Sequence, residues 1–301
     1  MYLLFITTIS ATLRSNTDSP RSKVALLLCV LGVPDCLPII HLWCHSIYCT
    51  VQYIRFVFAC SVDELLDGGV WTGEVTEIVG SVGAGKTQLC LQVCSQVCCH
   101  ESATVLYLDT TANFSAQRLC QIISKSLTSQ AEIEKALRRV YYVRAFNIYS
   151  ALQHLNAIKS RIVEHADSFY SGLKLVVVDI VSTLISPILG GQQSRGHSLM
   201  MELARTLKVL ATELGLAVLC TNGVVQDHTG VSVKSALGKS WSHVPSTRIF
   251  VQAVESDECV GSKRRVSLVK SSRIRTRGLF SYFYITSGGL TPLYTENVGD
   301  M

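Results

Sequence analysis

The stretch that most constrains this chain runs from residue 80 to residue 87 and has the sequence GSVGAGKT. It fills all four fixed positions of the pattern G-x-x-x-x-G-K-[ST], in which backbone N–H groups surround a phosphate. An apolar run, residues 75–79, precedes it, and a segment without Gly or Pro, residues 88–97, follows it. This order predicts a strand, a phosphate-binding loop and a helix whose N-terminus adds partial positive charge at the phosphate.

The residues of this loop have two roles: the glycines set the shape of the backbone, and Lys86 and Thr87 interact with the phosphates and the metal. Glycines allow the backbone to turn with positive φ and to bring successive N–H groups round one phosphate. Lys86 would reach the terminal phosphates and Thr87 would hold Mg²⁺. The nucleotide-contacting residues that we predict are Gly80, Ser81, Val82, Gly83, Ala84, Gly85, Lys86, Thr87 and Gln88. The alternative, a glycine-rich turn before an ordinary helix, leaves the four matched positions unexplained.

Beyond the loop, strand-like and helix-like segments alternate along the chain from about residue 60. We expect strands at 103–109, 140–143, 173–179, 216–221, 247–254, 265–270 and 279–286, and helices at 62–67, 116–127, 131–139, 150–163 and 197–214. Strands separated by helices of this length predict an α/β fold with a mostly parallel sheet and helices on both faces. We expect one such domain over residues 60–301.

Residues 1–59 differ in composition from the remainder of the chain. They carry six formal charges and no Glu, and between Val24 and Ile54 the only formal charge is Asp35. Three interpretations remain open: a membrane segment, a hydrophobic arm that docks on a partner, and a variant N-terminus without settled structure. Gly32, Pro34 and Pro38 interrupt the apolar run, so we expect no membrane association.

Twelve cysteines occur, and none forms the C-x-x-C pair that is typical of zinc sites. Cys90, Cys94 and Cys98 recur every four residues on the helix predicted after the loop. A metal there would need ligands from elsewhere, so we expect a row of buried thiols. Reduced thiols beside a nucleotide site indicate the cytosol or the nucleus.

The net charge of +5 is unevenly distributed. Residues 263–277, KRRVSLVKSSRIRTR, carry seven Lys or Arg and no acidic residue. Such a run suits either a solvated face or a polyanion site, and the sequence does not separate the two.

A magnesium ion on the loop threonine needs a second ligand, normally a carboxylate at the end of a neighbouring buried strand. Asp179 has that position, directly after the apolar segment LKLVVV. The alternative is an aspartate that caps the turn after the strand. We therefore predict that Thr87 and Asp179 form the metal site.

Several longer phrases of this sequence resemble a known family. GGVWTGEVTEIVGSVGAGKTQ, LKLVVVD, SPILGGQQ and ALGKSWSHVPSTRI are similar to the ATPase core of the eukaryotic RecA-like recombinases, and most similar to its D-type paralogs. The resemblance covers about residues 61–277. It implies a RecA-like P-loop core that binds ATP and Mg²⁺, a nuclear location, single-stranded DNA as a ligand and other recombinase paralogs as partners.

The sequence departs from that family in three places. Thr111 stands where the family has a glutamate that activates the attacking water, and Gly223 stands where a polar residue senses the γ-phosphate. The N-terminal helical domain of the family has no recognisable counterpart before Ser61. We therefore assign no catalytic residue and expect a weak DNA-dependent ATPase at most.

The resemblance also implies two DNA-binding loops, at residues 189–198 and 223–239. Arg195, Lys234 and Lys239 would contact phosphates in a salt-sensitive, sequence-independent manner. Trp241 is the one aromatic residue near these loops that we expect to be able to stack on a base.

The first functional hypothesis is a recombinase paralog that binds ATP and single-stranded DNA and serves homologous recombination repair within a complex of paralogs. The alternative is a scaffold subunit that binds nucleotide and makes only protein contacts. An independent hexameric helicase is disfavoured because the catalytic glutamate is missing.

Overall fold

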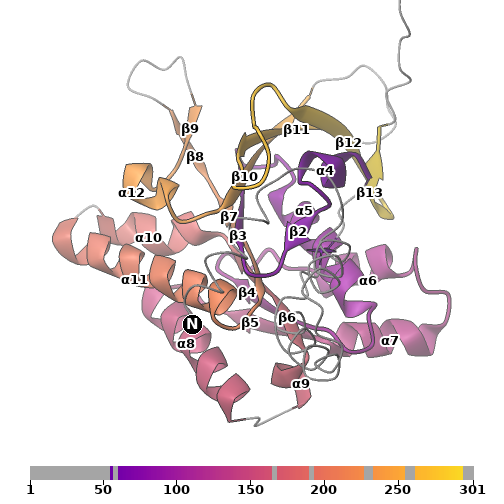
Figure 1. Cartoon of the computed structure of the whole chain (residues 1–301). Coiled ribbons are helices and arrows are strands. Elements are labelled where there is room, and N and C mark those ends of the chain that lie inside the picture. The colour runs from indigo at the N-terminus through magenta and orange to yellow at the C-terminus, as the bar shows by residue number, and fades with distance from the viewer. Residues whose placement is uncertain are drawn as a thin grey trace, which may run out of the picture. The chain divides into compact units, whose positions relative to one another are not determined.

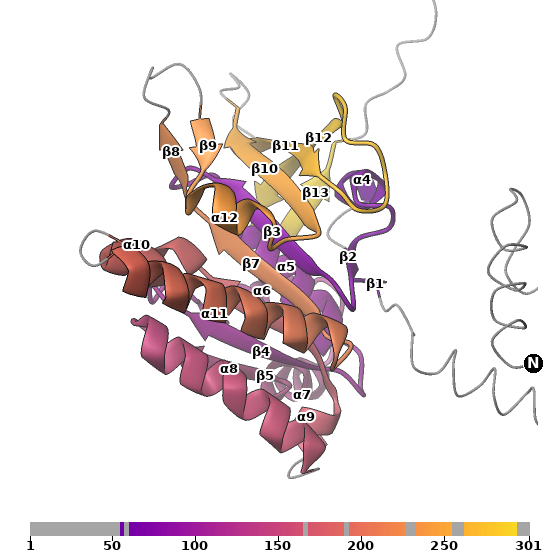
Figure 2. The ribbon, with the colours of Figure 1, turned by 60° about the vertical axis from the view of Figure 1, so that its left-hand side comes forward.

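A computed structural model of the chain describes residues 55–56, 60–164, 168–189, 193–226, 233–254 and 262–293. These residues all fall within one compact unit of the chain. Figures 1 and 2 show that this unit is built around one large sheet with helices on both faces. The α/β fold with a mostly parallel sheet, expected from the sequence, is confirmed.

The sheet has nine strands within the described residues, in the order β13-β12-β11-β10-β3-β7-β6-β4-β5. The parallel strands are β3 (Val75–Gly80), β4 (Thr104–Asp109), β5 (Val140–Arg144), β6 (Leu173–Asp179), β7 (Ala217–Asn222) and β10 (Thr247–Ala253). An antiparallel extension follows on one side, formed by β11 (Ser262–Lys270), β12 (Phe280–Thr286) and β13 (Gly289–Pro292). Every residue of β3, β4 and β7 is buried, as expected for parallel strands covered on both faces.

Two hydrophobic cores lie on opposite faces of the sheet. The first joins the sheet to α4 (Cys60–Leu65), α5 (Lys86–Cys98), α6 (Ala116–Ile123) and α7 (Gln130–Arg138). The second joins it to α8 (Ile148–Val163), α9 (Ser168–Ser171), α10 (Val181–Leu189), α11 (Gln193–Thr212) and α12 (Gly238–Ser242). Figure 2 shows α8, α10 and α11 as a layer on one side of the strands.

The thiols of α5 are part of the first core. Cys90, Cys94 and Cys98 are fully buried, which confirms the expected row of buried thiols. No group of three potential metal ligands occurs among His, Cys, Asp and Glu of the described residues. These cysteines therefore act as small apolar residues that let the helix approach the sheet.

The segment after β6 differs from the expectation of a loop over residues 189–198. α10 extends through Leu189 and α11 begins at Gln193, so the described residues at both ends of that segment are helical. Gly196 suggested a loop, but it lies within α11. A Cβ at Gly196 would collide with the carbonyl oxygen of Ile188, so glycine is required for the close approach of the two helices.

The expected long loop at residues 223–239 also contains regular structure. β8 (Val224–Gln226) and β9 (Val233–Ser235) pair antiparallel as a hairpin, and α12 begins at Gly238. The expectation was wrong for these residues because a pair of three-residue strands leaves too short an apolar pattern to detect. Figures 1 and 2 show the hairpin beside β10.

The other expected elements are present with boundaries that differ by up to four residues, and α6 ends at Ile123 rather than near residue 127. β1 (Arg55–Phe56) pairs with β2 (Val70–Trp71), whereas the rest of the atypical segment 1–59 lies outside the described residues. The membrane and docking-arm interpretations of that segment therefore stay untested. Among the residues described, no helix is both long and apolar enough to cross a membrane.

Two phenylalanines of β12 test whether the antiparallel extension belongs to the core. Phe283 is fully buried, whereas Phe280 is about half exposed. We expect Phe283→Ala to lower the free energy of unfolding by about 3–5 kcal/mol, because a large cavity forms in the core. The matched change Phe280→Ala is expected to cost less than about 1 kcal/mol. Equal losses in urea unfolding followed by circular dichroism would contradict this packing.

Candidate functional site

The phosphate-loop sequence connects the end of β3 to the start of α5. Gly83 and Gly85 have φ values of 76° and 104°, in the left-handed region that favours glycine. Gly85 is the N-cap of α5, and a Cβ there would lie 2.7 Å from Cδ1 of Ile285. The loop therefore has the strand, turn and helix geometry in which N–H groups converge on a phosphate.

Lys86 lies across this loop rather than pointing into solvent. Its Nζ donates hydrogen bonds to the carbonyl oxygens of Gly80 and Ser81, each at 2.8 Å. Burial lowers the pKa of Lys86, and the nearby Asp179 carboxylate opposes that effect. Two carbonyls of the loop thus hold the ammonium group of Lys86 in place. An anionic ligand can take their place as the hydrogen-bond acceptor.

Asp179 lies at the end of β6, beside the start of α5. Thr87 Oγ1 and the Tyr107 hydroxyl each donate to its Oδ2 at 2.8 Å, and Thr221 Oγ1 donates to its Oδ1. Its side chain accepts no backbone N–H among the described residues, so it does not cap the following turn. A buried carboxylate and a threonine hydroxyl in contact form an oxygen donor pair that suits Mg²⁺.

Asp109, at the end of β4, has the role of a turn cap instead. It accepts from the backbone N–H groups of Thr111, Asn113 and Phe114 at 3.0–3.4 Å, and from the Tyr142 hydroxyl at 3.2 Å. Thr111 is half-buried, and its hydroxyl accepts from Asn113 Nδ2 at 2.9 Å. Position 111 therefore offers no carboxylate. The nearest carboxylate in the sequence, that of Asp109, already accepts hydrogen bonds from the turn after β4.

Two arginines beside the phosphate loop were not predicted from the sequence. Arg264 of β11 donates from Nε to the Ala84 carbonyl at 3.0 Å and from Nη2 to the Gly83 carbonyl at 3.3 Å. Arg118 of α6 donates from Nε to Gln88 Oε1 at 2.8 Å. No local pattern could reveal Arg264, because about 180 residues separate it from the loop that it contacts.

Most of the basic run 263–277 is used inside the molecule. Arg273 pairs with Glu74 at 2.9 Å, and Lys270 Nζ donates to the carbonyls of Ser242 and Pro245 at 3.0 and 2.7 Å. Lys263 and Arg265 lie over the rings of Tyr282 and Phe280. The two alternatives for this run, a solvated face and a polyanion site, stay untested.

The three residues expected to contact DNA lie on different elements. Arg195 is exposed on α11, and its Nη2 donates to the Tyr149 hydroxyl at 3.1 Å. Lys234 is exposed on β9, and Lys239 is exposed on α12. All three lie on the side of the sheet that carries α8, α11 and the hairpin (Figure 2).

Trp241 is fully buried, so the expectation that it stacks on a base is wrong. Its Nε1 donates to Glu77 Oε1 at 2.7 Å, because α12 turns this side chain toward the sheet. Glu77 also accepts from Asn222 Nδ2 at 2.8 Å and forms an ion pair with Arg248. A buried polar network therefore joins the strand before the phosphate loop to β7, α12 and β10.

Gly223 supplies no side chain at the expected sensor position. Its N–H donates to Ser182 Oγ at 3.2 Å, and the preceding Asn222 donates to the carbonyl of Ala236 at 3.0 Å. Asn222 thus links the end of β7 to Ala236, the residue that follows the hairpin. Asn222 lies one residue before Gly223, the sensor position expected from the family.

We expect Cys94 of α5 and Cys99, the C-cap of the same helix, to differ in reactivity toward thiol reagents. A hydrogen bond with Cys98, together with the charge of Arg139, lowers the pKa of Cys99 to about 7, whereas burial and Asp179 raise the pKa of Cys94. A lowered pKa leaves the reactive thiolate populated at about pH 8. We therefore expect N-ethylmaleimide to modify Cys99 well before Cys94, and more slowly at a pH below 7, as followed by peptide mass spectrometry. Equal rates at the two cysteines would contradict these environments.

Comparison with known proteins agrees with this geometry. The family model Rad51 matches residues 54–291. The DNA repair protein RAD51 homolog 4 of Bos taurus is 44% identical over 216 residues, which cover 72% of this chain and 66% of that protein. The corresponding Mus musculus protein is 44% identical over 214 residues, covering 71% and 65%, and a probable homolog of Dictyostelium discoideum is 27% identical over 253 residues, covering 73% and 71%.

This chain spans just under two thirds of the length of the two mammalian relatives. The resemblance to the D-type paralogs, expected from the sequence, is confirmed by these matches. The chain belongs to the Rad51 family.

Proposed function

We propose that this chain is a nuclear ATP-binding subunit that serves homologous recombination repair of DNA breaks together with other RecA-like recombinase paralogs. The observation that carries the proposal is the convergence of Lys86, Thr87 and Asp179 at one end of the sheet, in a chain of the Rad51 family. The similar proteins of Bos taurus and Mus musculus are named DNA repair proteins, which supports the same process for this chain.

Rad51 family proteins bind ATP, and the loop from Gly80 to Gln88 fits that ligand here. A phosphate would replace the two carbonyls that now accept hydrogen bonds from Lys86 Nζ, and the ammonium would turn toward the ligand. Thr87 and Asp179 would hold Mg²⁺, whose charge offsets that of the phosphates. The ligand would be fixed by this chain's own loop, lysine and buried carboxylate.

The proposal includes slow hydrolysis, that is, a weak DNA-dependent ATPase at most. Water attack on a γ-phosphate needs a group that orients or deprotonates the water. Thr111 carries no carboxylate, and Asp109 is occupied by three backbone N–H groups. ATP would therefore act mainly by holding the site and its neighbouring strands in one arrangement.

Single-stranded DNA is the proposed ligand of Arg195, Lys234 and Lys239. Their charges would contact phosphates without reading the sequence. Base stacking by Trp241 is no part of the proposal, because its ring is fully buried. A second candidate, a scaffold subunit that makes only protein contacts, is favoured by the bond that already engages Arg195 with Tyr149.

Binding of a fluorescent oligo-dT strand, measured by anisotropy with and without Mg²⁺ and ATP, separates these candidates. We expect ATP-dependent binding, and we expect the double variant R195E/K234E to lower the slope of log affinity against log salt by about 2, since two phosphate contacts are lost. The control K135E/R138E makes the same change of charge on α7, among the helices of the opposite face.

Tight binding that is lost only in R195E/K234E supports the DNA-binding candidate. Equal weakening by both double variants, equal affinity with and without ATP, or no binding at low salt would contradict it and leave the scaffold candidate.

A further inference from the structure

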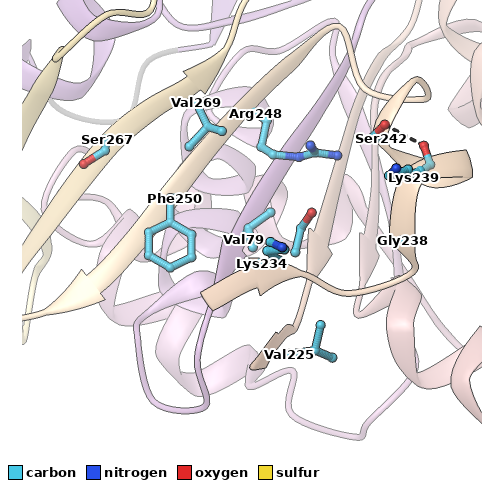
Figure 3. Close-up of a pocket in the computed structure, with 11 residues that line it drawn as sticks. Val79, Val225, Lys234, Gly238, Lys239, Ser242, Arg248, Phe250, Ser267 and Val269 are labelled. Atoms are coloured by element: carbon cyan, nitrogen blue, oxygen red, sulfur yellow. Dashed lines mark hydrogen bonds between the residues drawn. The ribbon is translucent and has the colours of Figure 1, made fainter. Parts of the chain in front are cut away.

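Arg264 of β11 lies on the face of the sheet that carries the phosphate loop's helix. Side chains alternate between the two faces along a strand. Val266 and Leu268 belong to the core that is shared with α5, so Arg264, two residues before Val266, lies on that same face. Ser267 and Val269 instead line a cavity on the other face, beside the hairpin β8–β9 and α12 (Figure 3). The register of β11 therefore directs Arg264 toward the loop.

The guanidinium of Arg264 donates to a backbone carbonyl from each of its nitrogens. Nε donates to Ala84 at 3.0 Å, Nη2 donates to Gly83 at 3.3 Å, and Nη1 donates to the neighbouring Lys263 at 3.0 Å. No carboxylate pairs with this side chain in the part of the chain that the structure describes. An uncancelled positive charge thus lies on two consecutive carbonyls of the phosphate loop.

These two bonds determine which way the N–H groups of the loop point. In a planar trans peptide, the C=O and the N–H of one unit point in opposite directions. Because the carbonyls of Gly83 and Ala84 face the guanidinium, the N–H groups of Ala84 and Gly85 point away from it. The Ala84 N–H accordingly lies inside the loop, where it donates to the Ser81 carbonyl at 3.2 Å, the oxygen that also accepts from Lys86 Nζ.

The charge of Arg264 also makes these N–H groups better donors. Linked hydrogen bonds polarise one another, and a charged donor strengthens the bond that it makes. A guanidinium on the carbonyl of a peptide unit therefore strengthens the N–H at the other side of that unit as a donor to an anion. The same charge adds to the positive potential at the N-terminus of α5.

The rest of the antiparallel extension holds the loop and its helix from the same side. A Cβ at Gly85, whose φ is 104°, would lie 2.7 Å from Cδ1 of Ile285 on β12. Further along α5, Gln92 Oε1 accepts from the backbone N–H of Leu290 on β13 at 3.0 Å. β11, β12 and β13 thus each contact the loop or its helix, and Arg264 acts from a fixed frame.

We propose that Arg264 is a positioning residue for nucleotide binding. By holding the carbonyls of Gly83 and Ala84, it presents the N–H groups of Ala84 and Gly85 to a phosphate and acts on the ligand through the loop backbone. The inference rests on the proposed binding of ATP at this loop, and it adds that the position of β11 sets the affinity of the loop for its ligand.

Two variants separate the geometry of Arg264 from its charge. R264Q removes the charge and is too short to bridge both carbonyls, whereas R264K keeps the charge but replaces the planar fork by a single ammonium group. The control R265Q makes the same change of charge at the next residue, whose side chain lies over the ring of Phe280 on the other face.

Hydrogen exchange of the full chain without nucleotide tests the anchor itself. We expect the amides of residues 80–88 to exchange about tenfold faster in R264Q than in the wild type, because the loop opens more often when two charge-assisted bonds are lost. R265Q should exchange as the wild type does. Mass spectrometry of peptides that cover the loop measures these rates.

Titration with a fluorescent ATP analogue and Mg²⁺ tests the consequence for binding. R264Q should weaken binding about tenfold and R264K about threefold, since lysine restores the charge and one of the two bonds. R265Q should leave the affinity unchanged. Equal midpoints of urea unfolding in R264Q and R265Q would show that the lost affinity is not a lost fold, and R264K carries the same comparison if R264Q does not fold.

Three results would overturn the proposal: equal loop exchange in R264Q and the wild type, equal loss of affinity in R264Q and R265Q, or unchanged affinity in R264Q. If the wild-type chain does not bind the ATP analogue, the proposed ATP function fails instead. The exchange rates without nucleotide then still decide whether Arg264 holds the loop, so the two failures are distinguishable.

Discussion

The buried carboxylate of Asp179 is the constraint on which this site depends. A carboxyl group that is 1% exposed must be met by hydrogen-bond partners, and three hydroxyls supply them. They come from the start of α5, from β4 and from β7, so the carboxylate is satisfied only when those elements are in register. The same arrangement brings the Thr87 hydroxyl and the Asp179 carboxylate, which we propose hold Mg²⁺, to the end of the loop.

A second buried carboxylate, Glu77 on β3, organises the contacts on the face of the sheet that carries α12. Its partners on β7, α12 and β10 place the hairpin and the antiparallel extension relative to β3. From that extension Arg264 reaches the carbonyls of Gly83 and Ala84. The loop is thus supported by β11, about 180 residues later in the chain.

The sequence predicted the parts of this site that depend on local order. The loop, its flanking strand and helix, and Asp179 follow from spacing and from apolar runs of four or more residues. What could not be predicted depends on distant packing. Gly196 is helical because it packs against the Ile188 carbonyl, a contact that the sequence does not reveal. Trp241 is buried because its indole N–H reaches Glu77, 164 residues earlier. The two short strands of the hairpin carry too few residues for a periodic signal.

The central claim is that the loop holds ATP to shape an assembly and cleaves it slowly. The most direct test is to load the purified chain with Mg²⁺ and ATP, remove free nucleotide rapidly, and identify the retained nucleotide by anion-exchange chromatography over time. The account predicts that the retained nucleotide stays mainly triphosphate over many minutes, and that Lys86→Ala retains none. Retained nucleotide that is rapidly converted to diphosphate, or equal retention by Lys86→Ala, would contradict it.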